Sequence, residues 1–450
     1  MSLPKRITLL QATAINMIDM VGIGPFIVSS TVVSIMGGAN CLYAWLAGAV
    51  LSLLDSKVWS ELGAALPEAG GSYAFLRETY GKDRWGRMIS FLFIWQTLFQ
   101  SSFVVASGAI GFSGYVQYLL PIPDAFVQKL VSGAVVVCVT AALYRNISSI
   151  GKLSVVLWVC VIGTLGWIIV SGLFFGHLPA LSTFAFTPFR VGTEDVRKLG
   201  DAMQLTVYAY LGYYNVCHLG SEIVDPGRNI PRSMLISILG IAVLYILMQV
   251  SILSVLDPAE IHAKQFIVSL FMERLYGPDV AAFATVLVLL IALSSLFAVI
   301  LGYSRIPYAA ARQGNFLPMF AATHPTENFP HVSLLFIGGI SLVITMVTSD
   351  LKLVVGTILT MRILVQFVGQ SLGLVRYRKT VGASNMPFRM WLYPVPLVVG
   401  VGIWLWLFFS RDVMLIAGGL GMLLLGVCVY LGTASLASWF PFSDEKPSGA

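Results

Sequence analysis

Charged residues are scarce in this chain of 450 residues: they make up 11% of it, whereas 57% of the residues are hydrophobic. A soluble globular domain carries about 25% charged residues, so this composition excludes a soluble enzyme, a disordered protein and a coiled coil. The apolar residues occur in runs of about 20 or more, the length of a helix that crosses about 30 Å of hydrocarbon. Because these runs do not alternate as strands do, they argue against a membrane barrel. We expect an integral helical membrane protein.

Several chemical signatures are also missing. The five cysteines show no CxxC spacing, which argues against a disulfide framework or a metal cluster. The motifs GxxxxGK[ST], HExxH and GxSxG are absent and the histidines are dispersed, so we predict no enzyme activity, no cofactor and no metal. The N-terminus leads into an apolar segment without a cleavage site. It is interpreted as a retained first span and not as a signal peptide.

The apolar runs predict about twelve membrane spans, with edges uncertain by several residues. Their positions are 8–37, 40–65, 86–116, 125–144, 150–176, 199–224, 231–256, 279–308, 331–349, 351–375, 388–409 and 412–437. The net charge of +6 comes from Lys and Arg in the short loops between these runs, which indicates membrane topology and not nucleic-acid binding. Basic residues favour the N-terminus and the even-numbered loops, so both termini are predicted to be cytoplasmic.

The first span is interrupted near its middle by Gly22, Gly24 and Pro25. Glycine costs about 1 kcal/mol and proline about 3 kcal/mol in a helix interior, and proline suits the first turn of a restarted helix. The interruption therefore predicts either a simple kink or two half-helices joined by unwound backbone.

The sixth span is interrupted at Leu211 and Gly212, between aromatic and amide side chains. Spans one and six occupy corresponding positions of two five-span halves, the pattern of an inverted-repeat transporter. Unwound backbone persists at membrane depth where it lines a cavity. We expect the half-helix that begins near Pro25 to face an anionic group and the one that ends near Leu211 to face a cationic group. A zwitterion carries both groups.

Four motifs resemble those of the amino acid–polyamine–organocation superfamily, and the resemblance covers nearly the whole chain. The segment Gly22–Gly24 is similar to the GxG of its first span, and Trp59–Gly63 with Pro67–Tyr73 is similar to its second-span signature. Ser221–Pro231 resembles the run ExxxPxxNIP that follows span six, and Ser304–Arg312 resembles the motif at the end of span eight.

This resemblance implies an all-α membrane fold with two inverted five-helix repeats, in residues 1–176 and 177–380, and two further helices with a cytoplasmic tail in residues 381–450. It implies discontinuous helices 1 and 6 and transport of amino acids or related amines. Tyr208 matches the family's aromatic gate; its alternative is a packed tyrosine with a hydrogen-bonded hydroxyl. The candidate substrate-binding residues flank both breaks: Val21, Gly22, Ile23, Gly24, Tyr208, Tyr210, Leu211, Gly212, Tyr214 and Asn215.

Span three is expected to supply wall residues, for which Phe99, Ser102 and Phe103 are candidates. In span eight, Ser295 is a further candidate for the pocket wall, and Ser294 is a candidate for ion coupling. Sodium-coupled relatives use hydroxyl groups from spans one and eight as ion ligands, which draws attention to Ser294 and also to Ser29 and Ser30. The alternative for these serines is hydrogen bonding between helices.

Charged side chains within spans are costly and therefore candidates for coupling. They are Asp19, Asp55, Lys57 and Arg362; Asp55 could pair with Lys57, and Arg362 could face the pathway or act as a structural clamp. Several relatives place a lysine inside span five, where it substitutes for a bound cation. The stretch Leu153–Val170 has none, so Asp19, Asp55 or a sodium ion are the alternatives.

We predict a secondary transporter of amino acids in the cytoplasmic membrane, working by alternating access as a cation-coupled symporter or exchanger. The pocket candidates are uncharged, which favours a neutral substrate. The alternative is a polyamine or organocation permease, which would require an acid in the pocket; a receptor or channel is a third class. The expected partners are a small amino acid or amine, H⁺ or Na⁺, and the lipid bilayer, with no nucleic acid.

Overall fold

The computed structural model describes residues 7–442 except 69, 145–149, 177–191, 262–265 and 328. These residues form helices and no strand, and extended pairing is limited to isolated bridges such as that between Ile7 and Ile223. The predicted all-α class is therefore confirmed for this part of the chain.

The helices of the first half of the chain begin with α1 and α2, which are separated by three residues. In order they are α1 (Leu9–Met20), α2 (Gly24–Met36), η1 (Gly38–Asn40), α3 (Cys41–Ala65), α4 (Ser72–Tyr80), α5 (Trp85–Leu119), α6 (Ala125–Leu143), α7 (Ile150–Phe175), α9 (Thr193–Tyr210), η2 (Asn215–His218) and η3 (Gly220–Glu222).

The second half continues with long helices and a π-helical segment inside the tenth predicted span. In order they are α10 (Pro226–Leu253), α11 (Pro258–Ile261), α12 (Ile267–Tyr276), α13 (Pro278–Arg312), η4 (Pro318–Ala321), α14 (His331–Val347), α15 (Leu351–Arg362), the π-helix η5 (Ile363–Gly369), α16 (Gln370–Val381), η6 (Ala383–Asn385), α17 (Val395–Phe409) and α18 (Val413–Ala437).

Seven helices in the described residues are long and apolar enough to cross a membrane, and the bent pair α1–α2 makes an eighth candidate. Shorter apolar helices occupy 159–175, 331–347 and 395–409. Most predicted spans agree with helices to within a few residues, but α10 begins at Pro226 and not at 231, because proline is tolerated in a first turn. The sixth predicted span ends as a helix at Tyr210 and continues as 3₁₀ turns.

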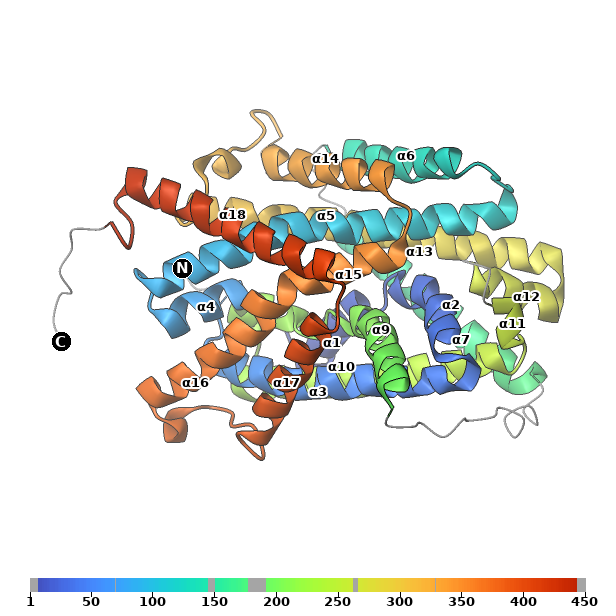
Figure 1. Ribbon diagram of the computed structural model, residues 1–450, viewed down its shortest axis with the longest axis horizontal. Coiled ribbons are helices and arrows are strands. Elements are labelled where there is room, and N and C mark those ends of the chain that lie inside the picture. Colours follow the sequence, from blue (N-terminus) through green and yellow to red (C-terminus); the bar gives the residue numbers. More distant parts are fainter. Residues whose placement is uncertain are drawn as a thin grey trace.

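The long helices run roughly along the longest axis of the molecule (Figure 1). Figure 1 places α4 and α16 at one end of the helical bundle and α11 and α12 at the opposite end. Helix α5 packs against α13 and α15 on its inner side and against α6 and α14 on its outer side. The broken pair α1–α2 packs against α10 and α9, so the interrupted spans lie inside the bundle.

Small residues let α5 approach its neighbours closely. A Cβ added to Gly111 would lie 2.5 Å from Cγ2 of Ile27 in α2, and one added to Gly108 would lie 2.8 Å from Cδ2 of Leu296 in α13. Glycine and serine at helix contacts permit such packing in membranes, where lipid offers apolar side chains no advantage in associating. Helix α5 therefore holds both α2 and α13.

A buried ion pair joins α3 to α16. Glu61 is fully buried and accepts hydrogen bonds from Nε and Nη2 of Arg378 and from the backbone N–H of Met390. The Arg378 guanidinium also lies over the ring of Tyr393, 3.7 Å from its centre.

We predict that Glu61→Gln lowers the melting temperature of the purified protein strongly. The substitution leaves the Arg378 guanidinium, whose side chain is 10% exposed, without its counter-charge, and breaking a buried pair costs about 3–5 kcal/mol. Glu194→Gln is the control, because it breaks the solvent-exposed ion pair with Lys198. Equal melting temperatures for both variants would contradict a stabilising role of the Glu61–Arg378 pair.

Candidate functional site

The first break separates α1 from α2 by Val21, Gly22 and Ile23, and the two helices are bent by 53°. Pro25 occupies the first turn of α2, as expected from its fixed φ angle. The N–H groups of Gly22 and Ile23 donate no hydrogen bond to any residue that the structure describes. The N–H of Gly24 likewise donates to no described residue, whereas Pro25 has no N–H and those of Phe26 and Ile27 donate to the carbonyl of Ile23. These free N–H groups lie at the start of α2, where a helix carries partial positive charge.

The second break follows Tyr210, where the chain leaves α9 and makes turns from Leu211 to Tyr214. Gly212 has φ +121°, a conformation that other residues rarely adopt. The carbonyl groups of Ala209 and Tyr210 accept from no amide of the described residues, and the end of a helix carries partial negative charge. The two breaks thus present opposite helix ends.

The two breaks touch each other. A Cβ added to Gly212 would lie 2.8 Å from the carbonyl carbon of Asp19, and one added to Gly24 would lie 3.5 Å from Cε1 of Tyr208. The side chain of Asn16 in α1 accepts a hydrogen bond of 2.9 Å from the backbone N–H of Val216, beyond the second break. The interruptions seen separately in the sequence therefore form one site.

Tyr245 of α10 bridges the ends of both broken helices. Its hydroxyl lies 2.8 Å from the carbonyl oxygen of Met20, the last residue of α1, and 3.1 Å from that of Ala209 in the last turn of α9. The side chain is fully buried and its ring packs against Trp45 and Tyr210. Because one O–H carries one proton, this hydroxyl is shared between the two breaks. Sequence reasoning did not identify it, since a lone tyrosine in an apolar span carries no signal.

Tyr208, the predicted gate, lies beside the first break and forms a 2.8 Å hydrogen bond with Ser107 of α5. Ser295 of α13 faces the first break: its hydroxyl oxygen is 2.9 Å from the position of a Cβ on Gly22. Tyr208 and Ser295 keep part of their surface accessible and Asp19 is exposed, whereas Val21 and Ile23 are buried. Spans one, three, six and eight therefore meet here.

Of the wall candidates from span three, Phe99 and Ser102 make contacts away from this meeting point, whereas Phe103 packs near Tyr208. Phe99 packs against Trp95 and against Phe336 of α14. Ser102 donates a hydrogen bond to the carbonyl of Leu98 in its own helix. Phe103 belongs to a small cluster that includes Tyr208. The residues of α5 nearest the breaks are Ser107 and Gly108, about one to two turns further along; the sequence had not singled them out.

The other candidates that lie near the second break make contacts of different kinds. The Tyr210 side chain packs against Trp45 and Tyr245 in the core, so we leave it out of the site. Tyr214 stacks on Trp59 with ring centres 4.3 Å apart. Asn215 begins η2, and its N–H donates to the carbonyl of Gly212.

Among the serines considered for ion binding, two have their protons engaged within their own helices. The Ser29 hydroxyl donates to the carbonyl of Pro25, and the Ser294 hydroxyl donates to that of Leu290. Ser30 is buried. No two of these hydroxyl groups share a hydrogen bond in the described residues.

The charged candidates separate into different environments. Arg362 is buried at the end of α15; it donates 2.5 Å and 2.8 Å hydrogen bonds to the hydroxyl of Tyr214 and the amide oxygen of Gln366. Asp55 accepts from Tyr213 and Trp404. Lys57 is half-buried and has no ion pair with a described residue, so the suggested Asp55–Lys57 pair is absent.

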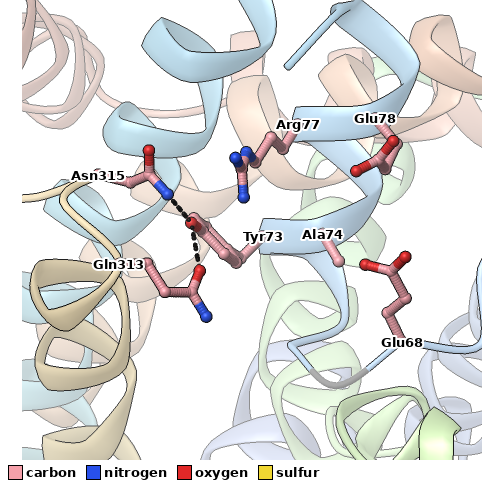
Figure 2. A pocket seen from close by; sticks show the side chains of 7 residues that line it. All are labelled: Glu68, Tyr73, Ala74, Arg77, Glu78, Gln313 and Asn315. Atoms are coloured by element: carbon pink, nitrogen blue, oxygen red, sulfur yellow. Dashed lines mark hydrogen bonds between the residues drawn. The ribbon is translucent and has the colours of Figure 1, made fainter. Parts of the chain in front are cut away.

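A pocket of about 400 Å³ lies at the end of the helical bundle that α4 and α16 occupy (Figure 2). Tyr73 at its centre donates to the side chain of Gln313 and accepts from that of Asn315, which ties α4 to the end of α13. The adjacent Ser72 and Tyr80 bond to Gln370 and to the carbonyl of Gly369. The pocket lining is Glu68, Tyr73, Ala74, Arg77, Glu78, Gln313 and Asn315.

The fold and the paired breaks define a multi-pass helical membrane protein of the kind expected for a transporter. A model of the amino acid permease family matches residues 7–439, and the chain belongs to this family. The Asc-type amino acid transporter 1 of Mus musculus is 28% identical, over 97% of this chain and 85% of the relative. The b(0,+)-type amino acid transporter 1 of Mus musculus is 27% identical, over 88% and 81%.

A third relative is the large neutral amino acids transporter small subunit 2 of Rattus norvegicus, which is 26% identical over 78% of this chain and 66% of the relative. All three relatives are amino acid transporters by name. The predicted resemblance to the amino acid–polyamine–organocation superfamily is confirmed, and the family and these relatives are transporters.

We predict that Gly212→Ala impairs the site. The substitution forces a side chain into a φ of +121° and places its Cβ 2.8–2.9 Å from the backbone and carboxylate of Asp19. The melting temperature should fall and amino acid uptake should be lost. Gly302→Ala is the control, because nothing lies within 4 Å of its added Cβ. Normal uptake by Gly212→Ala would contradict close contact of the breaks.

We predict that Tyr245→Phe weakens binding of the amino acid that stabilises the wild-type protein most in a thermal-shift screen. The lost hydrogen bond is worth about 1 kcal/mol, which corresponds to about a fivefold higher half-saturating concentration. Tyr430→Phe removes a comparable hydroxyl, which donates to the carbonyl of Phe440 far from the breaks. Equal binding by the two variants would show that Tyr245 does not position the breaks.

Proposed function

We propose that this protein is a secondary transporter that moves amino acids across the cytoplasmic membrane by alternating access. The observation that carries the proposal is the contact between two helix breaks whose free ends have opposite polarity. Buried unwound backbone is costly in a membrane and is retained where it binds a ligand. An amino acid is a zwitterion and matches both ends.

In this proposal, the N–H groups at Gly22, Ile23 and the start of α2 bind the substrate carboxylate. The carbonyl groups at the end of α9 bind the ammonium group. Both contacts use the backbone, so they recognise the part that all amino acids share. Selectivity for the substrate side chain then rests on the groups with accessible surface around the breaks, Tyr208 and Ser295, with Tyr208 acting as the gate.

The substrate in this proposal is a neutral amino acid. One carboxylate, Asp19, is exposed beside the breaks, and the buried cation Arg362 lies close enough to interact with it electrostatically. The two charges offset each other, which leaves the site without a strong preference for a charged substrate. The names of the relatives include neutral amino acids and do not favour the polyamine alternative.

The proposed architecture has twelve spans in two inverted five-helix repeats, residues 1–176 and 177–380, followed by two helices in 381–450. Both termini face the cytoplasm, because basic residues concentrate in the loops on that side. The end that carries α4 and α16 is then cytoplasmic. Transport is coupled to a cation, as symport or as exchange.

A thermal-shift screen of the purified protein against the twenty amino acids and against polyamines tests this function. We expect a neutral amino acid to raise the melting temperature in a concentration-dependent way, because a ligand that binds the folded state stabilises it. The same compound should drive counterflow in proteoliposomes. Stabilisation by polyamines alone, or binding without counterflow, would overturn the proposal.

A further inference from the structure

Asp55 is a buried carboxylate inside the membrane-spanning helix α3, with 3% of its surface exposed. Its Oδ1 accepts a 3.2 Å hydrogen bond from the indole N–H of Trp404 in α17, and its Oδ2 accepts one from the hydroxyl of Tyr213 in the second break. Both donors are neutral. Within the described residues Asp55 belongs to no ion pair.

The charged and titratable groups around Asp55 do not neutralise it. Arg362 of α15 is the cation that interacts with it electrostatically, but this guanidinium donates its hydrogen bonds to Tyr214 and Gln366. On the same helix, Lys57 is half-buried and forms no ion pair with any residue that the structure describes. Glu61, the other intramembrane acid of α3, forms an ion pair with Arg378. Asp55 therefore differs from Glu61 in having neutral partners.

An ionised carboxylate in this setting is unstable compared with a paired one, because burying a charge without a counter-charge costs several kcal/mol. Binding one proton removes this cost. The surroundings suit either charge state: Trp404 can only donate, so Oδ1 stays an acceptor, whereas the Tyr213 hydroxyl can donate or accept. Protonation on Oδ2 reverses the hydrogen bond, so that the Tyr213 hydroxyl accepts from Asp55 and its own O–H, which stays intact, can donate to another acceptor.

We propose that Asp55 binds the proton that this transporter carries together with its substrate. The inference rests on the proposed function and specifies its coupling ion. Because Tyr213 belongs to the second break, reversing its hydrogen bond to Asp55 changes how that break is held against α3. One O–H bond of a hydronium ion breaks as the O–H bond on Oδ2 forms on one side of the membrane, and the proton passes from Oδ2 to water on the other side. No electron transfer is involved.

Proteoliposomes that contain the full chain test this proposal. A neutral amino acid that binds in the thermal-shift screen is supplied outside, and the outside is made more acidic by about one pH unit. One proton per substrate supports about tenfold accumulation for each pH unit, so the wild-type protein should accumulate substrate about tenfold. Asp55→Asn should reach equal concentrations on both sides while retaining counterflow. Asp279→Asn, at the start of α13, is the matched control and should accumulate as the wild type does.

The outcomes separate the two proposals. Accumulation by Asp55→Asn equal to that of the wild type overturns the role of Asp55, as does wild-type counterflow with no response to the pH gradient. If the wild type shows no counterflow of any amino acid, the proposed function itself fails. Should Asp55→Asn give no folded protein, Tyr213→Phe takes its place. We expect a lower ratio of accumulated substrate to counterflow rate than in the wild type, and an unchanged ratio overturns the proposal.

Discussion

The structure depends on one constraint: every backbone N–H and C=O inside the hydrocarbon needs a hydrogen-bonding partner. Two interrupted helices violate this constraint unless other groups replace the lost bonds. The Asn16 side chain accepts a hydrogen bond from the N–H of Val216, and the Tyr245 hydroxyl shares its one proton between carbonyl oxygens at both breaks. The N–H groups of Gly22 and Ile23 remain without an acceptor in the described residues. These are the groups that a carboxylate can satisfy.

Charge inside the helical bundle is handled in two different ways. Glu61 and Arg378 neutralise each other and fix α3 to α16, which is a structural use of charge. Asp55 instead accepts a hydrogen bond from Tyr213, and Arg362 donates one to Tyr214. Both tyrosines are neutral side chains of the second break. Consequently, the second break is held by two opposite charges that do not form an ion pair with each other. A change in either charge acts on the break directly.

The packing around the breaks explains why the site is built from several distant segments. Helix α5 presents small residues to α2 and α13, so these helices approach it closely. This contact brings Ser107 next to Tyr208 and Ser295 next to Gly22. At the end with α4, Tyr73 joins α4 to the end of α13 and lines the pocket in Figure 2.

The helical class, the positions of most spans and the two breaks could be predicted from the sequence. Hydrophobic run length and the backbone preferences of Gly22, Pro25 and Gly212 are local properties, so they do not depend on how the helices pack. The sequence could not assign partners. Whether Asp55 meets Lys57 or Tyr213, and which turn of α5 faces the breaks, depends on how helices rotate and pack. Tyr245 resembles any tyrosine in an apolar span until the fold brings Met20 and Ala209 to its hydroxyl. Those contacts join residues far apart in sequence, so tertiary structure decided them.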